Sequence, residues 1–376
     1  MIPQHGLLEI SRSRLFHNVE LIRRQSRAQL CATIKADAYG HGVRDMMPLL
    51  WNAGLRWIAV YTLDEALEVA AAADFHVLVL APLLLSSPSE ASLAPLAAHA
   101  SRIRVNLIDA ATARHLSQIL AKHHPHTALS VHIQIDTGLT RGGADPWDLS
   151  QLVDLIASLP NLRLEGIFSH LSHGDVPGHD ASQDQLAAFR AATNPLKSRH
   201  PELLLHLQNS GGTWTLQDPA LDMIRTGIAL YGLQPSTADP IPELRPIARV
   251  TAPILAIHHR AAGTGVGYGH SFRTNRESRI AVVPVGYADG YPRLASNRGL
   301  IVQINDREAP VIGRISMDQI TIDVTDVPAQ PGDRATIISW NAGERNSLDA
   351  LADAVGTIGY ELATHFGKRL RRVIVD

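Results

Sequence analysis

The sequence is poor in residues that build disulfides and thiolate metal sites, because Cys31 is the one cysteine among 376 residues. A lone cysteine forms neither an internal disulfide nor a thiolate cage, which is typical of a reducing cytoplasm. Charge of one sign is also lacking: 34 basic residues oppose 36 acidic ones, for a formal net charge of -2. This balance provides no basic field to attract nucleic acid or an anionic membrane. We expect a small-molecule partner and no nucleic acid.

Long apolar segments are lacking as well. The longest apolar run, residues 77–85, contains Pro82 and is far shorter than the ~20 residues that span a bilayer. The N-terminal sequence MIPQHGLLEI has neither the basic start nor the apolar stretch of a secretory signal. We therefore expect a cytoplasmic protein without a membrane partner.

What the sequence does contain, up to about residue 225, is an alternation of short apolar runs with longer amphipathic or alanine-rich segments. This alternation is typical of repeated βα units and a parallel sheet. Eight such units in about 240 residues predict a (β/α)8 TIM-type barrel. The expected strands are residues 31–35, 57–60, 77–81, 103–107, 129–136, 164–169, 203–208 and 222–225, with helices such as 62–73, 111–122 and 180–199 between them.

A proline-rich segment, residues 234–246, interrupts the alternation and predicts a domain boundary. We expect a barrel domain over residues 1–238, whose first eight or so residues pair with the second domain, and a second domain over 239–376. Beyond the boundary, β-branched runs separated by glycine, proline and aspartate predict a mostly antiparallel β domain. Its expected strands are 254–257, 280–285, 300–304, 319–324 and 335–339, and only 347–355 has a helical pattern.

Barrel active sites lie where strands end at their carboxyl side, so the first strand draws attention to Lys35. The chain has four lysines, and Lys35 alone follows an apolar strand. A desolvated amine at a barrel mouth can serve as a nucleophile or form a Schiff base. A lysine that merely extends from the rim to water is the alternative, and position alone does not separate the two.

Other strand ends carry further candidates. Arg141, in the glycine-rich turn after the fifth strand, could bind a carboxylate with two hydrogen bonds. His170 and His173 follow the sixth strand, but no acidic residues with metal-ligand spacing accompany them, so we expect no metal. The loops at Ser210 and Arg225 follow the last two strands, where barrels often bind phosphate.

The glycine-dense segment 263–269 lacks the spacing of a nucleotide-binding loop, and no helical pattern follows it. We expect a turn with glycines at positive φ, from which Tyr268 is presented. The histidine pairs 123–124 and 258–259 and the basic segment 368–372 are interpreted as solvated surface.

Together these segments resemble the alanine racemase family. The resemblance runs along the whole chain, in the family's order and spacing. It is carried by IKADAYGHG (34–42), DTG (136–138) with Arg141, RTGIALYG (225–232), VGYADGY (285–291), GRISMDQ (313–319) and TIGYE (357–361). It implies a barrel that binds pyridoxal 5'-phosphate (PLP), joined to a β domain, in a head-to-tail homodimer that racemises L-alanine to D-alanine for peptidoglycan.

The resemblance also implies roles for individual residues. Lys35 would form the Schiff base with PLP, and Lys35 and Tyr268 of the partner subunit would be the two acid–base groups. Arg141 and the main-chain N–H of Met317 of the partner subunit would bind the substrate carboxylate. The cofactor-binding residues would be Lys35, Tyr39, His170, Asn209, Ser210, Arg225, Gly227, Ile228 and Tyr360. Arg225 would face the pyridine nitrogen and His170 would link Tyr268 to Arg225.

The sequence departs from the family at Gln134, where many members have a carbamylated lysine that orients the arginine. A glutamine cannot be carbamylated, so a bound chloride or the Gln134 amide oxygen is expected to position Arg141. Ser316 stands where a cysteine is common, and we expect little effect on the reaction.

Four alternatives remain open. A racemase of serine or of broader specificity would use the same scaffold, because Tyr287, Tyr291 and Tyr360 do not fix the size of the substrate side chain. A PLP-dependent decarboxylase would need a cysteine in the second domain, and a PLP carrier would lack that domain. A metal-dependent hydrolase would lack the absorbance of bound PLP.

Overall fold

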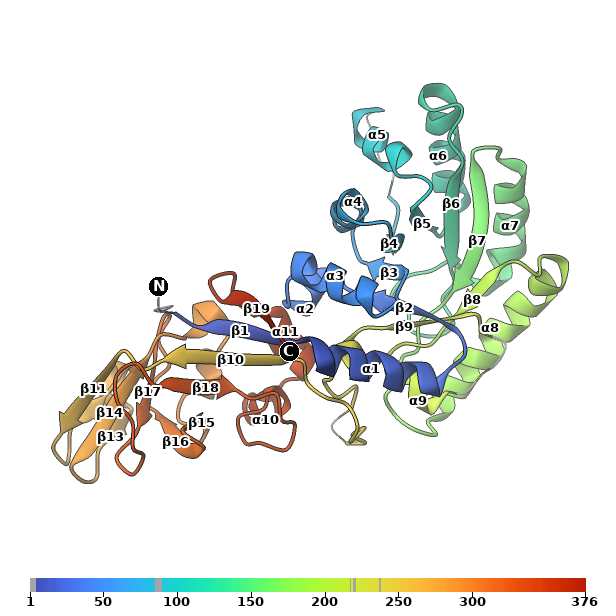
Figure 1. Cartoon of the computed structure of the whole chain (residues 1–376). Coiled ribbons are helices and arrows are strands. Elements are labelled where there is room, and N and C mark those ends of the chain that lie inside the picture. The colour runs from blue at the N-terminus through green and yellow to red at the C-terminus, as the bar shows by residue number, and fades with distance from the viewer. Residues whose placement is uncertain (1–4, 85–89, 217, 219–220, 237) are drawn as a thin grey trace.

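The computed structural model describes residues 5–84, 90–216, 218, 221–236 and 238–376. Two sheets dominate it, an eight-stranded parallel sheet and a nine-stranded sheet that is mostly antiparallel. In Figure 1 the parallel sheet and its helices form one lobe, and the second sheet extends away from it. The predicted (β/α)8 barrel with a C-terminal, mostly antiparallel β domain is confirmed.

The parallel sheet curves into a barrel in the order β8-β7-β6-β5-β4-β3-β2-β9. Backbone hydrogen bonds join its two edge strands, from Asp222 N to Leu205 O (2.8 Å) and from Arg225 N to Gln208 O (3.1 Å). The strands are β2 (Gln29–Thr33), β3 (Trp57–Val60), β4 (His76–Pro82), β5 (Ile103–Leu107), β6 (Leu129–Gln134), β7 (Leu162–Phe168), β8 (Leu204–His206) and β9 (Met223–Thr226).

Helices follow the strands and cover the outside of the barrel (Figure 1). Local sequence sets their ends; for example, Thr62 and Glu65 form a capping box that starts α4. The helical elements are α1 (Arg12–Gln25), α2 (Lys35–Tyr39), α3 (Val43–Asn52), α4 (Leu63–Ala72), α5 (Glu90–Ala98), α6 (Ala110–His123), η1 (Pro146–Asp148), α7 (Leu149–Ser158), α8 (Asp180–Arg199), α9 (Gly212–Thr215) and η2 (Ile228–Tyr231).

The inside of the barrel has an apolar side and a polar side. Strands β2, β3, β4 and β9 contribute a small apolar cluster, separate from the main core, made of Cys31, Trp57, Ala59, Leu78 and Met223. Strands β5 to β8 instead bury polar side chains, namely Arg104, Asn106, His132, Gln134 and His206. The Trp57 and His132 rings, 6.2 Å apart, meet across the barrel. Buried polar groups need partners, so the polar side must be hydrogen-bonded internally.

The second sheet has the order β11-β14-β17-β16-β15-β18-β10-β1-β19. Its first strand in sequence, β1 (Leu7–Ser11), pairs antiparallel with β10 and parallel with β19, so the N-terminus joins this sheet before α1 enters the barrel. Its other elements are β10 (Ala248–Pro253), β11 (Ala256–Arg260), β14 (Ser278–Val283), β15 (Ile301–Ile304), β16 (Arg307–Ile312), β17 (Ile320–Asp323), β18 (Arg334–Ile338) and β19 (Arg371–Val375), with the separate hairpin β12 (Gly265–Val266) and β13 (Phe272–Arg273).

Helical turns also occur here: η3 (Tyr268–His270), η4 (Tyr287–Asp289), η5 (Arg293–Ala295), α10 (Leu348–Val355) and α11 (Gly359–Thr364). The expectation of a single helix was wrong, because α11 follows α10 after a short break. The basic segment 368–372 was expected to be solvated, and Lys368, Arg369 and Arg371 are exposed, but Leu370 is buried and Arg372 is half-buried. Arg369 pairs with Asp289 and Asp318, and Arg372 donates to Gly40 O (2.7 Å) on the barrel.

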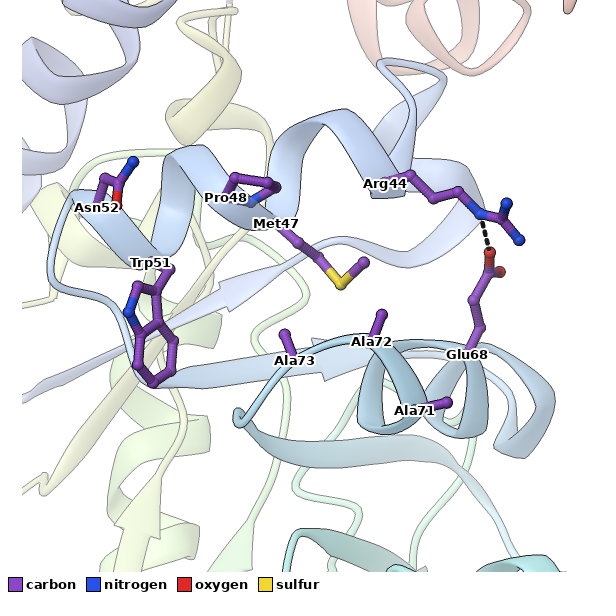
Figure 2. Close-up of a pocket in the computed structure, with 9 residues that line it drawn as sticks. All are labelled: Arg44, Met47, Pro48, Trp51, Asn52, Glu68, Ala71, Ala72 and Ala73. Carbon is purple, nitrogen blue, oxygen red and sulfur yellow. Dashed lines mark hydrogen bonds and ion pairs between the residues drawn. The ribbon is translucent and has the colours of Figure 1, made fainter.

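Figure 2 shows a groove between α3 and α4 on the outside of the barrel, lined by Met47, Trp51 and alanines of α4. The Arg44–Glu68 ion pair (3.1 Å) crosses one end of it. Its volume is about 720 Å³, yet it lies away from the carboxyl ends of the strands, where barrels carry their chemistry. None of the helices in the described ranges is both long and apolar enough to cross a membrane.

Candidate active site

Lys35 lies two residues beyond the end of β2 and opens a left-handed turn. Ala36, Asp37, Ala38 and Tyr39 have φ of 53°, 54°, 55° and 52°. Each non-glycine residue costs roughly 1–2 kcal/mol in this conformation, so other contacts must hold the turn. The Glu65 carboxylate accepts from Ala36 N (2.7 Å), and the buried His41 ring contacts the carbonyls of Ala38 and Tyr39. The sequence therefore places Lys35 and Tyr39 on a strained but fixed piece of backbone.

The surroundings of Lys35 favour its neutral form. Burial lowers the pKa of the Lys35 amine, Arg141 and Arg225 lower it further, and Glu65 acts in the opposite direction. The neutral amine is the nucleophilic form, so this environment suits a lysine that bonds to a carbonyl carbon.

Two adjoining cavities, of about 470 and 480 Å³, open at this end of the barrel. Both are lined by Lys35, Arg141, His170 and Arg225, which therefore stand between them. The first also contains Tyr61, Gln134 and Phe168. The second also contains Tyr39, Asn209, Ser210, Gly227, Ile228 and Tyr360. Ten residues predicted from separate segments thus meet at one place.

The second cavity is rich in hydrogen-bond donors. Ser210 Oγ accepts from Gly227 N (2.9 Å), which ties the loop after β8 to the loop after β9. A Cβ on Gly227 would lie 2.3 Å from the Tyr39 hydroxyl, so only glycine lets this phenol reach the loop. Burial raises the pKa of Tyr39 to about 12, and it raises the pKa of Tyr360 as well. Both phenols therefore keep their protons and remain donors suited to an anion.

Arg225 is 4% exposed and lies at the end of β9. Its guanidinium donates to Ser169 O (2.6 Å) and to His206 Nδ1 (2.6 Å), and lies 3.4 Å from His170 Nδ1. Burial, Arg225, Arg141 and Lys35 together lower the pKa of His170 to about 3, so its ring is neutral. The Arg225 side of the predicted link through His170 is therefore present.

Gln134 contacts the loop of Arg141 but not its guanidinium. Its amide oxygen accepts from Asn106 Nδ2 (2.9 Å), and its Nε2 donates to Gly142 O (2.9 Å). The expectation that the Gln134 oxygen positions Arg141 is not met in the described chain, where this oxygen accepts from Asn106 and no hydrogen bond joins it to Arg141. In the described part of the chain the Arg141 guanidinium has no hydrogen bond or ion pair, and Gln134 acts on the backbone that carries it.

Tyr268 and Met317 do not line these cavities. Tyr268 is 69% exposed in η3, and Met317 is 52% exposed after β16. Gly267 and Gly269, on either side of Tyr268, have φ of +70° and +67°, as expected for a turn that presents this side chain. The described chain therefore carries these two residues at the surface of its second domain.

Sequence reasoning missed several buried polar residues beneath the site. His206, at the end of β8, contacts Arg225 and also His132 of β6 (2.9 Å). Asn106 of β5 supports Gln134. Strand alternation contained a signal, because His132 lies two residues before Gln134 and so shares its face of β6.

The fold and site define a two-domain barrel enzyme with an amine, two arginines and an anion-binding set of donors at its mouth. Residues 10–235 match the family model of the alanine racemase N-terminal domain, and residues 247–374 match that of the C-terminal domain. The chain therefore belongs to the alanine racemase family. The expectation of an amino-acid racemase is confirmed.

Individual relatives are similar to this chain along nearly its whole length. Alanine racemase of Salinispora tropica is 37% identical over 355 residues, which cover 93% of this chain and 92% of that protein. The crystal structure of alanine racemase from D-cycloserine-producing Streptomyces lavendulae superimposes with a TM-score of 0.89 at 32% identity, covering 100% and 98% of the two chains. A structure from Bartonella henselae, described with covalently bound pyridoxal phosphate, gives a TM-score of 0.85 at 30% identity, covering 99% and 100%.

Proposed function

We propose that this protein is a PLP-dependent alanine racemase that converts L-alanine to D-alanine, with D-alanine supplying peptidoglycan synthesis. The observation that carries the proposal is the convergence of Lys35, Arg225 and a set of hydroxyl and backbone donors on one cavity. Family membership supports the reaction, and the relatives named above carry the substrate in their names.

The residues present fit PLP. The donor-rich cavity suits its phosphate, the half-buried Lys35 amine suits its aldehyde, and Arg225 is available to its ring nitrogen. When bound, PLP withdraws electrons from the amino acid and acidifies its α-proton. The residues that would hold it are Lys35, Tyr39, His170, Asn209, Ser210, Arg225, Gly227, Ile228 and Tyr360.

Arg225 limits how strongly the cofactor withdraws electrons. Burial, with Arg141 also contributing, lowers the pKa of Arg225 to about 10, with Cys31 opposing, which still leaves the guanidinium protonated at neutral pH. It therefore donates hydrogen bonds and does not give up a proton. Arg225 would thus leave the ring nitrogen of bound PLP without a full proton, which would favour return of the α-proton over side reactions such as transamination.

Racemisation requires one group to remove a proton from one face of the α-carbon and a second group to deliver a proton to the other face. Lys35 Nζ is the first group. Tyr268 of the partner subunit is the second, with His170 joining it to Arg225. Arg141, together with the main-chain N–H of Met317 of the partner subunit, binds the substrate carboxylate.

This division of labour requires a head-to-tail homodimer in which residues 239–376 of each chain complete the barrel site of the other. The exposure of Tyr268 and Met317 in the single chain supports it, since neither reaches the cavities of its own barrel. A racemase of serine or of broader specificity is the alternative on the same residues.

Two measurements test the proposal. The absorption spectrum of the purified protein, before and after borohydride reduction, should show bound PLP, and peptide mapping should locate the reduced adduct at Lys35. Turnover of L-alanine should exceed that of L-serine and L-lysine when the three are compared side by side. An adduct at a residue other than Lys35 would overturn the assignment of the site. Faster turnover of L-serine than of L-alanine would overturn the assignment of the substrate.

A further inference from the structure

A line of buried polar groups runs from Arg225 down into the barrel, and the reaction described above does not use it beyond Arg225. Arg225 Nη1 lies 2.6 Å from His206 Nδ1, and His206 Nε2 lies 2.9 Å from His132 Nδ1. His132 Nε2 then lies 3.7 Å from Glu165 Oε2, which is an ion-pair distance and longer than a hydrogen bond, and this nitrogen has no hydrogen-bond partner among the described residues. Both histidines are 0% exposed, so bulk solvent does not reach them.

The chemistry of these groups fixes the direction of the line. A guanidinium only donates, so His206 Nδ1 must accept and the proton of that ring must sit on Nε2. His206 Nε2 then donates to His132 Nδ1, which places the His132 proton on Nε2, facing the Glu165 carboxylate. Burial lowers the pKa of both His132 and His206, which keeps each ring at one proton and excludes opposed N–H groups.

The backbone is shaped to bring Glu165 into this line. The pairing of β6 with β7 shifts register after Val131, so that Glu165 is the extra residue of a bulge. Bulges re-aim side chains and are unusual between parallel strands. A Cβ on the next residue, Gly166, would lie 2.6 Å from the His132 ring, so the absence of a side chain there makes room for the histidine.

At the far end of the line, Glu165 forms an ion pair with Arg104. Arg104 donates to both oxygens of Glu165 (2.6 and 3.2 Å). Although burial acts to raise it, the pKa of Glu165 is lowered to about 2 by contacts with His132 and Arg104, so it is a carboxylate at neutral pH. In the described ranges no carboxylate pairs directly with the buried Arg225, which leaves Glu165, two imidazoles away, as its counter-charge along this line.

We infer that Glu165 is a positioning residue for the racemase reaction: its carboxylate attracts the Nε2–H end of a one-way hydrogen-bond relay, Arg225 to His206 to His132, which fixes both histidine tautomers and holds the guanidinium toward the cofactor ring. The inference rests on the proposed function for its catalytic consequence. The hydrogen-bond direction itself does not depend on that function.

Neutron diffraction from a deuterated crystal of the holoenzyme tests the direction of the relay. The expected result is a deuteron on Nε2 and none on Nδ1 of both His132 and His206. A deuteron on Nδ1 of either ring, or on both nitrogens of one ring, would overturn the inference. This readout requires no variant and no activity.

Kinetics test the consequence. In Glu165→Gln the amide can donate to His132 Nε2, which reverses the relay and sets N–H against N–H at Arg225. We expect kcat for alanine to fall roughly tenfold, as when outer-shell partners of a catalytic site are removed, while KM changes less than about twofold because Arg141 is untouched. Arg163→Gln is the matched control, because Arg163 also lies near Glu165 (3.5 Å) but is 67% exposed and outside the relay.

An unchanged kcat in a folded, PLP-loaded Glu165→Gln protein would overturn the inference, and so would an equal loss in Arg163→Gln. If Glu165→Gln does not fold, the deuteron positions decide alone. Failure of the proposed function is recognised separately, as wild-type protein that racemises no amino acid. A racemase with unaffected Glu165→Gln turnover contradicts only the relay.

Discussion

The two domains of this chain hold their functional residues in opposite ways. At the barrel mouth, Lys35, His170 and Arg225 are half-buried or buried, and neighbouring carbonyls and rings fix their positions. In the β domain, Tyr268 and Met317 are exposed on turns that contain glycine or follow it. Exposed apolar and aromatic side chains on a rigid turn are suited to being buried by another molecule.

The contrast agrees with the proposed shared site, because Tyr268 and Met317 do not reach the cavities of their own barrel. In that proposal the barrel supplies the covalent anchor and the carboxylate-binding arginine, and the β domain supplies the second acid–base group. A second copy of the chain is the simplest molecule that brings the halves together.

The largest expected loss of activity comes from a substitution in the barrel domain. Lys35→Ala removes the amine that holds the cofactor and moves the proton, so kcat/KM for alanine should fall at least about a thousandfold. Lys122→Ala, on the exposed face of α6, is the matched control and should retain full activity. Retention of a borohydride-reducible adduct in Lys35→Ala would contradict the assignment of the anchor.

The proposal that each β domain completes the site of the other subunit is tested most directly by combining two variant chains in one dimer. Lys35→Ala and Tyr268→Phe should each be nearly inactive alone. A mixed dimer has one site with both defects and one intact site, so purified mixed dimers should recover about half of the wild-type activity. The measurement is racemase activity after the two variants are co-expressed and purified together by two tags.

The control replaces the Tyr268→Phe chain with a chain carrying both substitutions, and this mixture should recover no activity. If the mixture of the two single variants also stays inactive, Tyr268 serves its own barrel and the proposed exchange of domains is refuted.

Much of this arrangement could be predicted from the sequence. The eight strand positions of the barrel follow from periodicity, which reports on local structure. The strands that were not predicted contain residues that are unusual in strands. Pro310 obscures β16, and β10 ends in Pro253, while the charged start of β19 conceals a strand that pairs with β1.

The candidate site was predictable only where its residues end strands or match a family motif. The polar side of the barrel was not predictable, because His206 and Glu165 come into contact with His132 only once the barrel closes. The bulge that aims Glu165 has no sequence signal beyond the following Gly166. Such contacts are non-local, and local propensity does not contain them.

A smaller effect is expected at Gln134, which contacts the backbone of the loop that carries the exposed Arg141. Gln134→Leu removes the bond to Gly142 O and one of the two acceptors of Asn106 Nδ2, which still donates to Leu80 O (2.8 Å). A net hydrogen bond of about 1 kcal/mol corresponds to roughly a fivefold rise in KM for alanine. Steady-state kinetics should show this rise with kcat changed much less, because the reacting atoms are not touched.

Gln134→Glu separates two explanations of how Arg141 is positioned. It accepts from Asn106 but cannot donate to Gly142 O, so KM should rise if the backbone contact matters. A fall in KM would show that Arg141 needs a nearby negative charge. The chloride hypothesis is tested on the wild type, since an unchanged KM and kcat in chloride-free buffer would remove it.

The smallest effect concerns acid stability and again separates the domains. His41 is buried in the barrel, where its ring stacks on Tyr231 (4.5 Å), and burial lowers its pKa to about 4. His132, His170 and His206, also in the barrel, have lowered pKa values as well, whereas His258 and His259 of the β domain are exposed.

Below pH 6.5 the unfolded chain binds protons at these buried histidines that the folded chain does not. The free energy of unfolding should therefore fall as pH decreases, by up to about 1.4 kcal/mol per pH unit for each buried histidine, until the folded pKa is reached. Hydrogen exchange at pH 7 and pH 5, corrected for intrinsic rates, should show protection lost in barrel peptides before β-domain peptides. His41→Gln should reduce this pH dependence and His258→Gln should not; equal losses of protection in both domains would contradict the assignment of acid sensitivity to the barrel.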